Sequence, residues 1–342
     1  MNIGILFGGK SFEHDISIIT ANTIYQILKD KYNIFLLYID HDGKLKYVKK
    51  MDVEKFVKKE DFKEFSFIYG GIKISRKKYK IDVLINAMHG TNGEDGLASV
   101  IANLYDIPFV GSNHISSALL MDKHFSYAVL SDSNINVIKT KCVLKNDYDI
   151  NDFSFPLIIK PARLGSSIGI NVCNNIDEFK ELISKSFEFD DKVVIQPYIS
   201  NFKEVNQAAY FYNNEVIASK LEEVFKNDKI LSFEDKYIVS KTGMDKKFIS
   251  DEKLIENVSE LTKKIYKLLE LSGVVRIDYM IIDEKIYVNE INTTPGSLSF
   301  YLFDDGVSFF KRLIYEALKN HQNKRIKTFD SFILYQKNFY KK

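Results

Sequence analysis

One stretch of the chain decides both fold and site: Arg276-Ile-Asp278-Tyr-Met-Ile-Ile-Asp-Glu-Lys-Ile-Tyr-Val-Asn-Glu290-Ile-Asn292-Thr-Thr-Pro-Gly296. Two apolar runs flank the polar turn Asp283-Glu284-Lys285, a pattern that predicts a β-hairpin. The pairing register of the two strands depends on the length of the loop. If these three residues form it, Ile282 faces Ile286, whereas a loop of two or four residues breaks this register.

The three-residue loop sets Asp278 opposite Glu290. It also sets Arg276 opposite Asn292, and because side chains alternate between faces, all four project on one side. Two carboxylates and an amide oxygen suit Mg²⁺ bridging nucleotide phosphates, and the guanidinium suits an anionic intermediate. The alternative is a solvent-facing strand pair with ordinary charges, which the shared face and the following Pro295-Gly296 make less favourable.

Composition limits the class of protein. The 342 residues, 45% hydrophobic and 13% aromatic, are enough for two or three packed domains. The 48 basic and 46 acidic residues leave a net charge of +2, so we expect neither a nucleic-acid nor a membrane-surface partner. Cys142 and Cys173 form no disulfide framework. Without a signal peptide or a membrane-length apolar run, we expect a cytoplasmic protein.

Three regions follow from the order of apolar runs. In residues 1–111, strands at Ile3–Phe7, Ile34–Ile39 and Ile81–Met88 alternate with a helix at Ile16–Leu28, which predicts a parallel α/β layer. A helix near 117–130 opens the second region, 112–195, whose strands look antiparallel. The apolar runs of the third region begin at about Lys192, and we predict a domain with the bounds 196–342.

The run Lys160-Pro-Ala-Arg163-Leu-Gly165-Ser166-Ser167-Ile-Gly169 puts a lysine just before a turn of small residues. Backbone N–H groups in such a turn can approach phosphate oxygens, and the lysine neutralises them. The spacing is not that of a Walker loop, so a plain hairpin turn competes about evenly. Lys123 is a second candidate phosphate lysine, against the alternative of a surface lysine. Lys236-Tyr237 adds hydrogen-bonding groups in a loop that is equally explained as an inert turn.

Taken in order, these segments resemble the D-alanine–D-alanine ligases, a family of ATP-grasp enzymes, over some three hundred residues. The matching segments are Gly8 to Ser17, His89 to Gly96, Met121 to Lys123, Lys160 to Ser167, Lys236-Tyr237 and Arg276 to Gly296. The resemblance implies an N-terminal α/β domain followed by a two-part ATP-grasp fold, with ATP between the second and third domains. It also implies a homodimer.

The resemblance implies roles for individual residues. Asp278, Glu290 and Asn292 hold two Mg²⁺ ions, with Mn²⁺ as an alternative. ATP contacts come from seven positions: Lys123, Lys160, Gly165, Ser166, Ser167, Gln196 near adenine and Glu204 at the ribose. In the implied reaction, ATP phosphorylates the carboxylate of the first amino acid, and the amine of the second attacks the acylphosphate.

The implied substrate contacts are spread along the chain. Glu13 fixes the first ammonium and links through Ser166 to Tyr237, ordering the loop over the site. Arg276 and the Gly296 backbone N–H form the oxyanion site. Further substrate contacts fall at four residues: His89, Lys236, Ser297 and Tyr301. A buried structural histidine is the alternative for His89, and an exposed glutamate is the alternative for Glu204.

Several positions depart from the family pattern. Leu164 stands where the family usually has a glutamate in the serine turn. Gln196 stands at a position that is often acidic in the family, and Tyr127 at one where a lysine or arginine is common. Tyr301 replaces the serine expected at the second amino acid, and the segment after Tyr237 lacks the usual proline-alanine ending. These changes leave the ATP half intact and put the acceptor in question.

Four functions remain in competition. The leading one is ATP-dependent synthesis of D-alanyl-D-alanine for peptidoglycan. The nearest alternative is a related ligase that joins D-alanine or another amino acid to a different amino or hydroxy acid. A small-metabolite kinase would share the hairpin but has less use for Glu13 with Ser166 and Tyr237. A non-catalytic nucleotide-binding module is least favoured, because Arg276 and the presumed metal ligands are all present.

Overall fold

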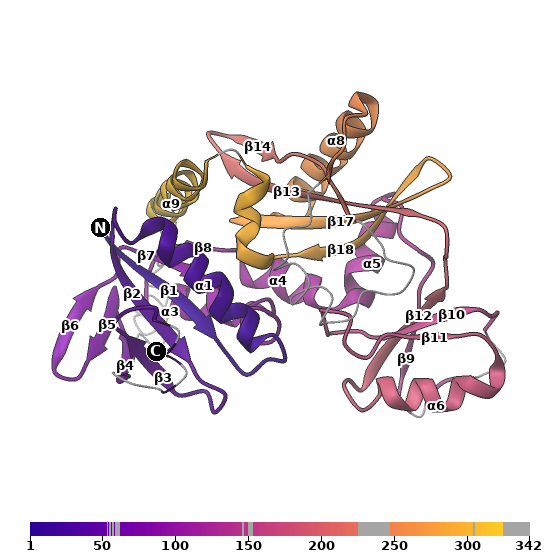
Figure 1. The fold of residues 1–342 in the computed structure, drawn as a ribbon, viewed down its shortest axis with the longest axis horizontal. Helices are drawn as coiled ribbons and strands as arrows, with labels where there is room; N and C mark the ends of the chain where they lie inside the picture. Colours follow the sequence, from indigo (N-terminus) through magenta and orange to yellow (C-terminus); the bar gives the residue numbers. More distant parts are fainter. Residues whose placement is uncertain are drawn as a thin grey trace, which may run out of the picture.

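The computed structural model describes residues 1–52, 54, 56, 58, 62–145, 147–149, 153–224, 247–303 and 305–323. These residues form three sheets that follow one another along the chain. Figure 1 shows the N-terminal sheet in indigo and purple on the left, the central sheet in pink at lower right, and the C-terminal sheet in orange above and between them. The α/β and ATP-grasp architecture predicted from the sequence therefore has three sheet-based parts.

The N-terminal sheet has eight strands in the order β6-β5-β4-β3-β2-β1-β7-β8. Its elements are β1 (Asn2–Gly8), α1 (His14–Leu28), β2 (Asn33–Ile39), β3 (Leu45–Val48), β4 (Lys63–Ile68), β5 (Gly71–Ile74), β6 (Lys77–Lys80), β7 (Val83–Asn86), α3 (Leu97–Leu104) and β8 (Phe109–Val110). The pairs of β1 with β2, β1 with β7, and β7 with β8 are parallel, as predicted. Strands β3 to β6 extend the sheet antiparallel, which the sequence analysis did not anticipate.

The central part is an antiparallel sheet preceded in sequence by two helices, with a third helix between its last two strands. Its elements are α4 (His114–Met121), α5 (Lys123–Asp132), β9 (Lys141–Leu144), β10 (Leu157–Pro161), β11 (Asn171–Cys173), α6 (Ile176–Ser186) and β12 (Lys192–Pro197). Strand β12 pairs with β10 and β9, so the strand from Lys192 belongs here, and the prediction that it opens the third region is wrong.

The helix predicted near 117–130 is two helices. Asp122 has an extended backbone and ends α4, and its side chain caps α5 by accepting from the backbone N–H groups of His124 and Phe125 at 3.0 and 3.3 Å. The break places Lys123 at the first position of α5. The buried Lys123 side chain thereby starts from a helix N-terminus that faces the central sheet.

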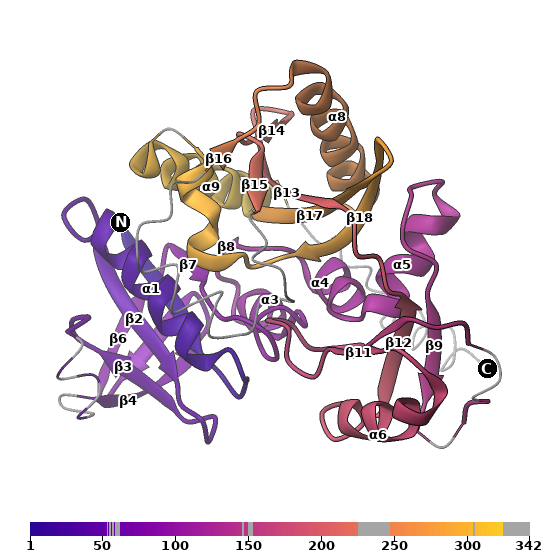
Figure 2. The ribbon, with the colours of Figure 1, turned by 45° about the vertical axis from the view of Figure 1, so that its right-hand side comes forward.

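The C-terminal sheet carries most of the predicted site. Its elements are β13 (Lys203–Tyr212), β14 (Glu215–Ala218), β15 (Glu222–Val224), β16 (Lys247–Phe248), α8 (Glu252–Leu268), β17 (Val274–Ile282), β18 (Lys285–Asn292), the 3₁₀ turn η3 (Gly296–Leu302) and α9 (Gly306–Asn323). One hydrophobic core runs from Ile5 on β1 to Tyr210 on β13 and Phe310 on α9. Because α9 packs on the N-terminal sheet, the first and third parts share this core, and Figure 2 shows α9 and β13 above β7 and β8.

The hairpin that opened the sequence analysis forms, but its turn is shorter than predicted. Ile282 pairs with Lys285, so the turn has two residues, Asp283 and Glu284, both with positive φ. A β-bulge at Asn289 then restores the predicted pairs, Asp278 with Glu290 and Arg276 with Asn292. The predicted register is confirmed, while the predicted loop of three residues is wrong.

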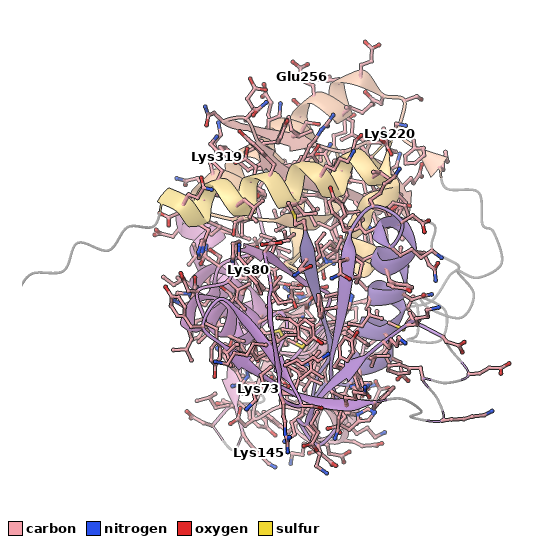
Figure 3. All side chains as sticks on the ribbon, turned by 90° about the vertical axis from the view of Figure 1, so that its left-hand side faces the viewer. Lys73, Lys80, Lys145, Lys220, Glu256 and Lys319 are labelled. Carbon is pink, nitrogen blue, oxygen red and sulfur yellow. The ribbon has the colours of Figure 1, made fainter. Side chains whose placement is uncertain are left out.

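The charged surface is mixed in sign and spread over all three parts. Exposed lysines labelled in Figure 3 lie on the N-terminal, central and C-terminal parts: Lys73, Lys80, Lys145 and Lys220. In the part of the chain that the structure describes, every helix is too short or too polar to span a lipid bilayer.

Candidate active site

The polar face of the β17–β18 hairpin forms the centre of the site. Arg276 donates two hydrogen bonds to Asp278, from Nε to Oδ1 at 2.6 Å and from one terminal nitrogen to Oδ2 at 2.8 Å. Asn292 Nδ2 donates to the same Oδ2 at 3.1 Å. From the neighbouring strand β13, Asn206 pairs with Asp278 and, with its amide nitrogen toward the carboxylate, donates to Oδ1 at 3.2 Å. The predicted residues therefore share one face, joined by an asparagine that the sequence analysis missed.

Lys123 reaches this face from α5. Its Nζ lies 3.1 Å from Glu290 Oε1 and donates to the backbone carbonyl of Leu164 at 2.5 Å. Burial works to lower the pKa of the ammonium, but the charge and hydrogen bond of Glu290, together with Tyr127 and Glu13, outweigh it and the pKa is raised. Lys123 therefore carries a positive charge that links the metal-side carboxylate to the serine turn.

Tyr127, which departs from the family pattern, has a defined place on α5. Its hydroxyl donates to the backbone carbonyl of Asn289, the bulged residue, at 2.8 Å and accepts from Lys160 Nζ at 3.3 Å. Burial raises the pKa of Tyr127 to about 12, so the phenol stays protonated at neutral pH. Gln196 Nε2 donates to Thr140 Oγ1 at 2.7 Å in the same region. The side chains at two positions that depart from the family pattern, Tyr127 and Gln196, therefore have defined hydrogen-bond partners.

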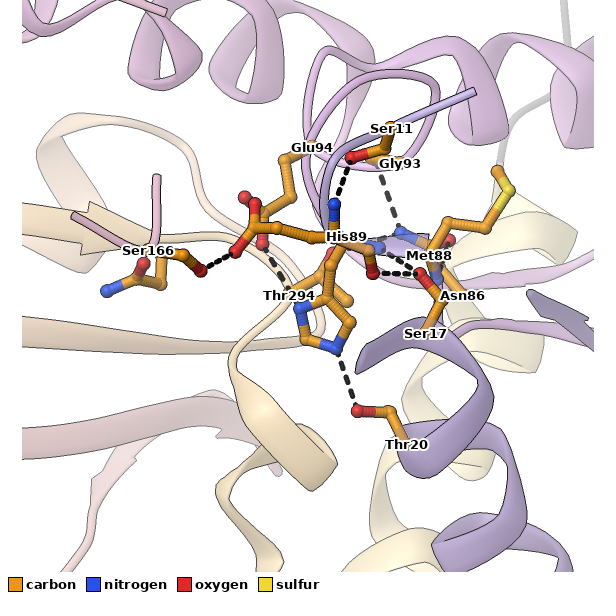
Figure 4. Close-up of polar contacts among 12 residues, drawn as sticks. Ser11, Ser17, Thr20, Asn86, Met88, His89, Gly93, Glu94, Ser166 and Thr294 are labelled. Carbon is orange, nitrogen blue, oxygen red and sulfur yellow. Dashed lines mark hydrogen bonds and ion pairs between the residues drawn. The ribbon is translucent and has the colours of Figure 1, made fainter. Parts of the chain in front are cut away.

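Glu13 and the serine turn meet as the sequence predicts. Glu13 precedes α1, is buried, and accepts a short hydrogen bond from the hydroxyl of Ser166, drawn in Figure 4. Ser166 and Ser167 both have positive φ. A side chain at Gly165 would begin 3.2 Å from Glu13 Oε2, so glycine lets the turn approach the carboxylate closely. The N-terminal and central parts are joined at this point.

Beside this link, Phe12 and Phe189 contact each other across the same two parts. Their ring centroids lie 6.0 Å apart in an edge-to-face arrangement. Phe189 also packs against the end of the serine turn, because a Cβ on Gly169 would lie only 3.0 Å from its ring. The polar contact at Glu13 and the aromatic contact at Phe12 therefore hold the turn from two sides.

His89 and Glu94 lie near each other in the N-terminal part (Figure 4). His89 Nε2 is 2.7 Å from the Thr20 hydroxyl, and Nδ1 is 3.8 Å from Glu94. Burial, with the nearby Arg276 charge, lowers the pKa of His89 to about 3. Burial, with the charges of Glu13 and Glu290, raises the pKa of Glu94 well above its usual range. His89 is therefore neutral near pH 7, and Glu94 holds its proton to a higher pH than an exposed glutamate does.

The turn after the hairpin faces the same space. A Cβ on Gly296 would meet nothing within 4 Å. The Ser297 backbone N–H donates to Thr20 at 3.0 Å, and the Tyr301 hydroxyl donates to Glu222 Oε2 at 3.4 Å. Burial raises the pKa of Tyr301 to about 12, so its hydroxyl remains a hydrogen-bond donor.

The remaining predicted residues divide into two groups. Glu204 lies on β13 opposite Met280, two residues from Asn206 and so on the same face of the sheet. Lys236 and Tyr237 lie outside the described residues. Sequence reasoning missed Thr20 and Asn206, and no spacing marks either residue; Glu94 lay within the segment His89 to Gly96 without a role of its own.

The donor set tests whether a metal fits. Among the described residues, no three His, Cys, Asp or Glu side chains form a metal-binding group. The hairpin offers two carboxylates and an amide oxygen. Mg²⁺ commonly takes one or two protein carboxylates and completes its octahedron with waters and substrate phosphates, so the set fits Mg²⁺ bound together with a nucleotide.

The three sheets and the charged hairpin face define an ATP-grasp enzyme. The chain belongs to the D-alanine–D-alanine ligase family: the models described as D-ala D-ala ligase N-terminus and C-terminus match residues 2–112 and 125–317. The D-alanine–D-alanine ligase of Thermosipho melanesiensis is 37% identical, with 98% of each chain covered.

Solved structures agree with this family. The D-alanine-D-alanine ligase from Helicobacter pylori superposes with a TM-score of 0.80 at 29% identity, covering 92% of this chain and 98% of that one. VanG D-Ala:D-Ser ligase from Enterococcus faecalis gives 0.75 at 26% identity, covering 94% and 99%. The second name shows that this fold serves more than one acceptor.

Proposed function

We propose that the protein uses ATP to join two D-alanine molecules into D-alanyl-D-alanine for peptidoglycan synthesis. The observation that carries the proposal is the hairpin face on which Arg276, Asp278, Glu290 and Asn292 meet, with Glu13 nearby and hydrogen-bonded to the serine turn. Phosphoryl transfer needs groups that offset the charge on the phosphate oxygens, and the hairpin face would provide them. Ligation also needs a partner for the ammonium of the first amino acid, and Glu13 would be that partner.

Asp278, Glu290 and Asn292 would hold two Mg²⁺ ions, and Mn²⁺ would be the alternative. Bound there, the ions would offset charge on the phosphate oxygens. Lys123 and Lys160 would contact the ATP phosphates, exchanging Glu290 and Tyr127 for phosphate oxygens. Gly165 and the serine turn would cover the phosphates. Gln196 would contact adenine and Glu204 the ribose, since both lie on strands that border this space.

The chain's own residues then explain amide formation. Glu13 would be the partner for the first ammonium, because it is the carboxylate that meets the serine turn, and burial favours the neutral forms of His89 and Glu94. His89 contributes shape and one hydrogen bond. Arg276 and the Gly296 N–H would stabilise the oxyanion formed when the second amine attacks. The turn held by Glu13 would exclude water, which otherwise hydrolyses an acylphosphate. Phosphate leaves and the amide remains.

The acceptor is the least constrained part of the proposal. Lys236, Ser297 and Tyr301 are the proposed contacts for the second amino acid. The Ser297 hydroxyl donates to Thr23 at 3.3 Å and that of Tyr301 to Glu222, so each would change partner to reach a carboxylate. A second candidate, a ligase whose acceptor is another amino or hydroxy acid, is supported by Tyr301 standing where the family usually has a serine.

One assay separates these functions. Phosphate release is measured with ATP and Mg²⁺ over D-alanine, D-serine, L-amino acids and D-lactate, and products are identified by mass spectrometry. We expect D-alanyl-D-alanine from D-alanine alone. A mixed product that forms only with a second compound supports the other acceptor. ATP binding without any ligation contradicts both and favours a kinase or a non-catalytic module.

We further propose that the enzyme works as a cytoplasmic homodimer. The support is the family resemblance and a substrate set of small, water-soluble molecules. Light scattering after size-exclusion chromatography tests the assembly, since a single 39.6 kDa species contradicts it.

A further inference from the structure

A buried hydroxyl on α1 touches two parts of the site. Thr20 is fully buried, and its Oγ1 lies 2.7 Å from His89 Nε2 and 3.0 Å from the backbone nitrogen of Ser297. His89 follows β7 of the N-terminal sheet, whereas Ser297 begins the turn after the C-terminal hairpin. Figure 4 shows Thr20 at the end of the chain of contacts through His89. One side chain thus joins the two predicted substrate sides.

The proton on the Thr20 hydroxyl can be assigned from this geometry. Thr20 accepts from the Ser297 N–H, and among the described residues its other hydrogen-bond partner is His89. A buried hydroxyl proton needs an acceptor, and Nε2 of His89 is the one within reach. His89 therefore carries its own proton on Nδ1, which faces Glu94 at 3.8 Å.

The turn that Thr20 holds has an unfavourable backbone. Ser297, Leu298 and Ser299 have φ of 51, 52 and 49°, in the left-handed region. This conformation is unfavourable for residues other than glycine, so contacts from elsewhere must maintain it. Thr20 holds the first of the three through its backbone, and Thr23, one turn later on α1, contacts only the Ser297 side chain.

We propose that Thr20 is a positioning residue that ties His89, on the donor side, to the left-handed turn that presents the acceptor. The tie would make the turn adopt its binding geometry only when the N-terminal and C-terminal parts are packed together. Asn86 adds a parallel contact, donating from Nδ2 to Thr294 Oγ1 at 3.0 Å. The identity of the acceptor rests on the proposed function, but the tie itself does not.

A substrate-free experiment tests the tie. Hydrogen exchange of the peptide covering residues 295–300 is followed by mass spectrometry in the unmodified protein and in Thr20→Val, Thr20→Ser and Thr23→Val. We expect Thr20→Val to speed exchange by about tenfold, the loss of one buried hydrogen bond. Thr20→Ser and Thr23→Val should match the unmodified protein. Equal exchange in all four proteins overturns the tie, as does equal acceleration in Thr20→Val and Thr23→Val.

Kinetics then test the positioning role. The dependence of the initial rate on D-alanine concentration gives two half-saturation constants. Thr20→Val should raise the acceptor constant about tenfold and the donor constant less than about threefold, and Thr20→Ser should restore both. Equal changes in both constants, or no rescue by serine, contradict the proposal. If the unmodified protein makes no dipeptide, the proposed function fails, while hydrogen exchange still decides on Thr20.

Discussion

The β17–β18 hairpin and the η3 turn follow each other in the chain, yet different parts of the molecule hold them. The hairpin is held by its own ladder and by β13, and alternation alone puts its polar residues on one face. The η3 turn has three left-handed residues, and the backbone N–H of the first of them, Ser297, is bonded to Thr20 in the N-terminal part. The buried Ser299 hydroxyl has no hydrogen-bond partner among the described residues.

The two regions should therefore affect different steps: the hairpin face the chemical reaction, and the η3 turn the choice of the second substrate. A substitution on the hairpin face removes a charged group whose position is set locally, so it should change the rate of the chemical steps. A substitution in the support of the turn moves backbone atoms that a distant element positions, so it should change how the second substrate fits or how stable the assembled parts are.

The sharpest test on the hairpin side is Arg276→Ala. We expect ligation to fall about 10²–10³-fold, the usual loss for one oxyanion donor, with ATP binding largely intact. Dipeptide formation and calorimetric ATP titration measure the two effects. Arg312→Ala is the matched control, because this guanidinium lies on α9 and donates to Tyr210 at 2.9 Å. Unchanged turnover in Arg276→Ala contradicts the oxyanion role.

On the side of the turn, His89→Gln should change how stability depends on pH. His89 is held neutral, with its pKa lowered to about 3 from 6.5, so below pH 6.5 the unfolded chain binds a proton that the folded chain does not. This contribution to stability is complete above pH 6.5 and is lost as the pH falls. Between pH 7 and pH 5 the unmodified protein should lose about 2 kcal/mol more than His89→Gln.

Urea unfolding of both proteins at several pH values measures this difference. Parallel stability curves for the two proteins over that range would show that His89 is protonated in the folded state.

Returning to the hairpin, Glu290→Gln should raise the Mg²⁺ concentration needed for half-maximal activity about tenfold, since one of two carboxylate ligands loses its charge. The variant also removes the charge that pairs with Lys123 at 3.1 Å. Glu284→Gln, in the exposed turn of the same hairpin, is the control. An unaltered Mg²⁺ dependence in Glu290→Gln rules out its assignment as a ligand.

The hairpin face was predictable because strand alternation and a polar turn are local signals. The prediction nevertheless depended on two errors that cancelled. A loop of two residues, not three, shifts the register by one, and the extra residue at Asn289 shifts it back. A bulge has no marker in this sequence. The Asn289 carbonyl bonds to Tyr127, 162 residues away, and only the folded molecule shows that pairing.

The supports of the turn were not predictable for the same reason. Thr20 stands inside an amphipathic helix, where a threonine ordinarily has no special meaning, and its two partners come from residues 69 and 277 positions away. The short antiparallel strands β3 to β6, four to six residues each, escaped notice beside the longer apolar runs of β1 and β2. Motifs located Glu13, His89 and Ser166, and the resemblance implied the link between Glu13 and Ser166, but nothing in the sequence indicated the contact of His89 with Thr20.

The smallest expected effect tests whether the bulge itself matters. Tyr127→Phe removes the hydroxyl that bonds both the bulge carbonyl and Lys160. Because Lys160 would lose this hydrogen bond while its contact with the ring, at 5.7 Å, remains, we expect the KM for ATP to rise about threefold, near the lower limit for one hydrogen bond. The pH profile should not change between pH 6 and 9, because the phenol, with its pKa near 12, stays protonated there.

Tyr315→Phe, an exposed tyrosine on α9, is the control for this last variant. If Tyr127→Phe lowers the ligation rate as strongly as Arg276→Ala, the hairpin is not the locally determined element described above. Its chemistry would then depend on a tether from α5, as the turn depends on Thr20, and the contrast between the two regions would disappear. A threefold effect confined to ATP keeps the contrast, since the ladder then holds the charged face without help.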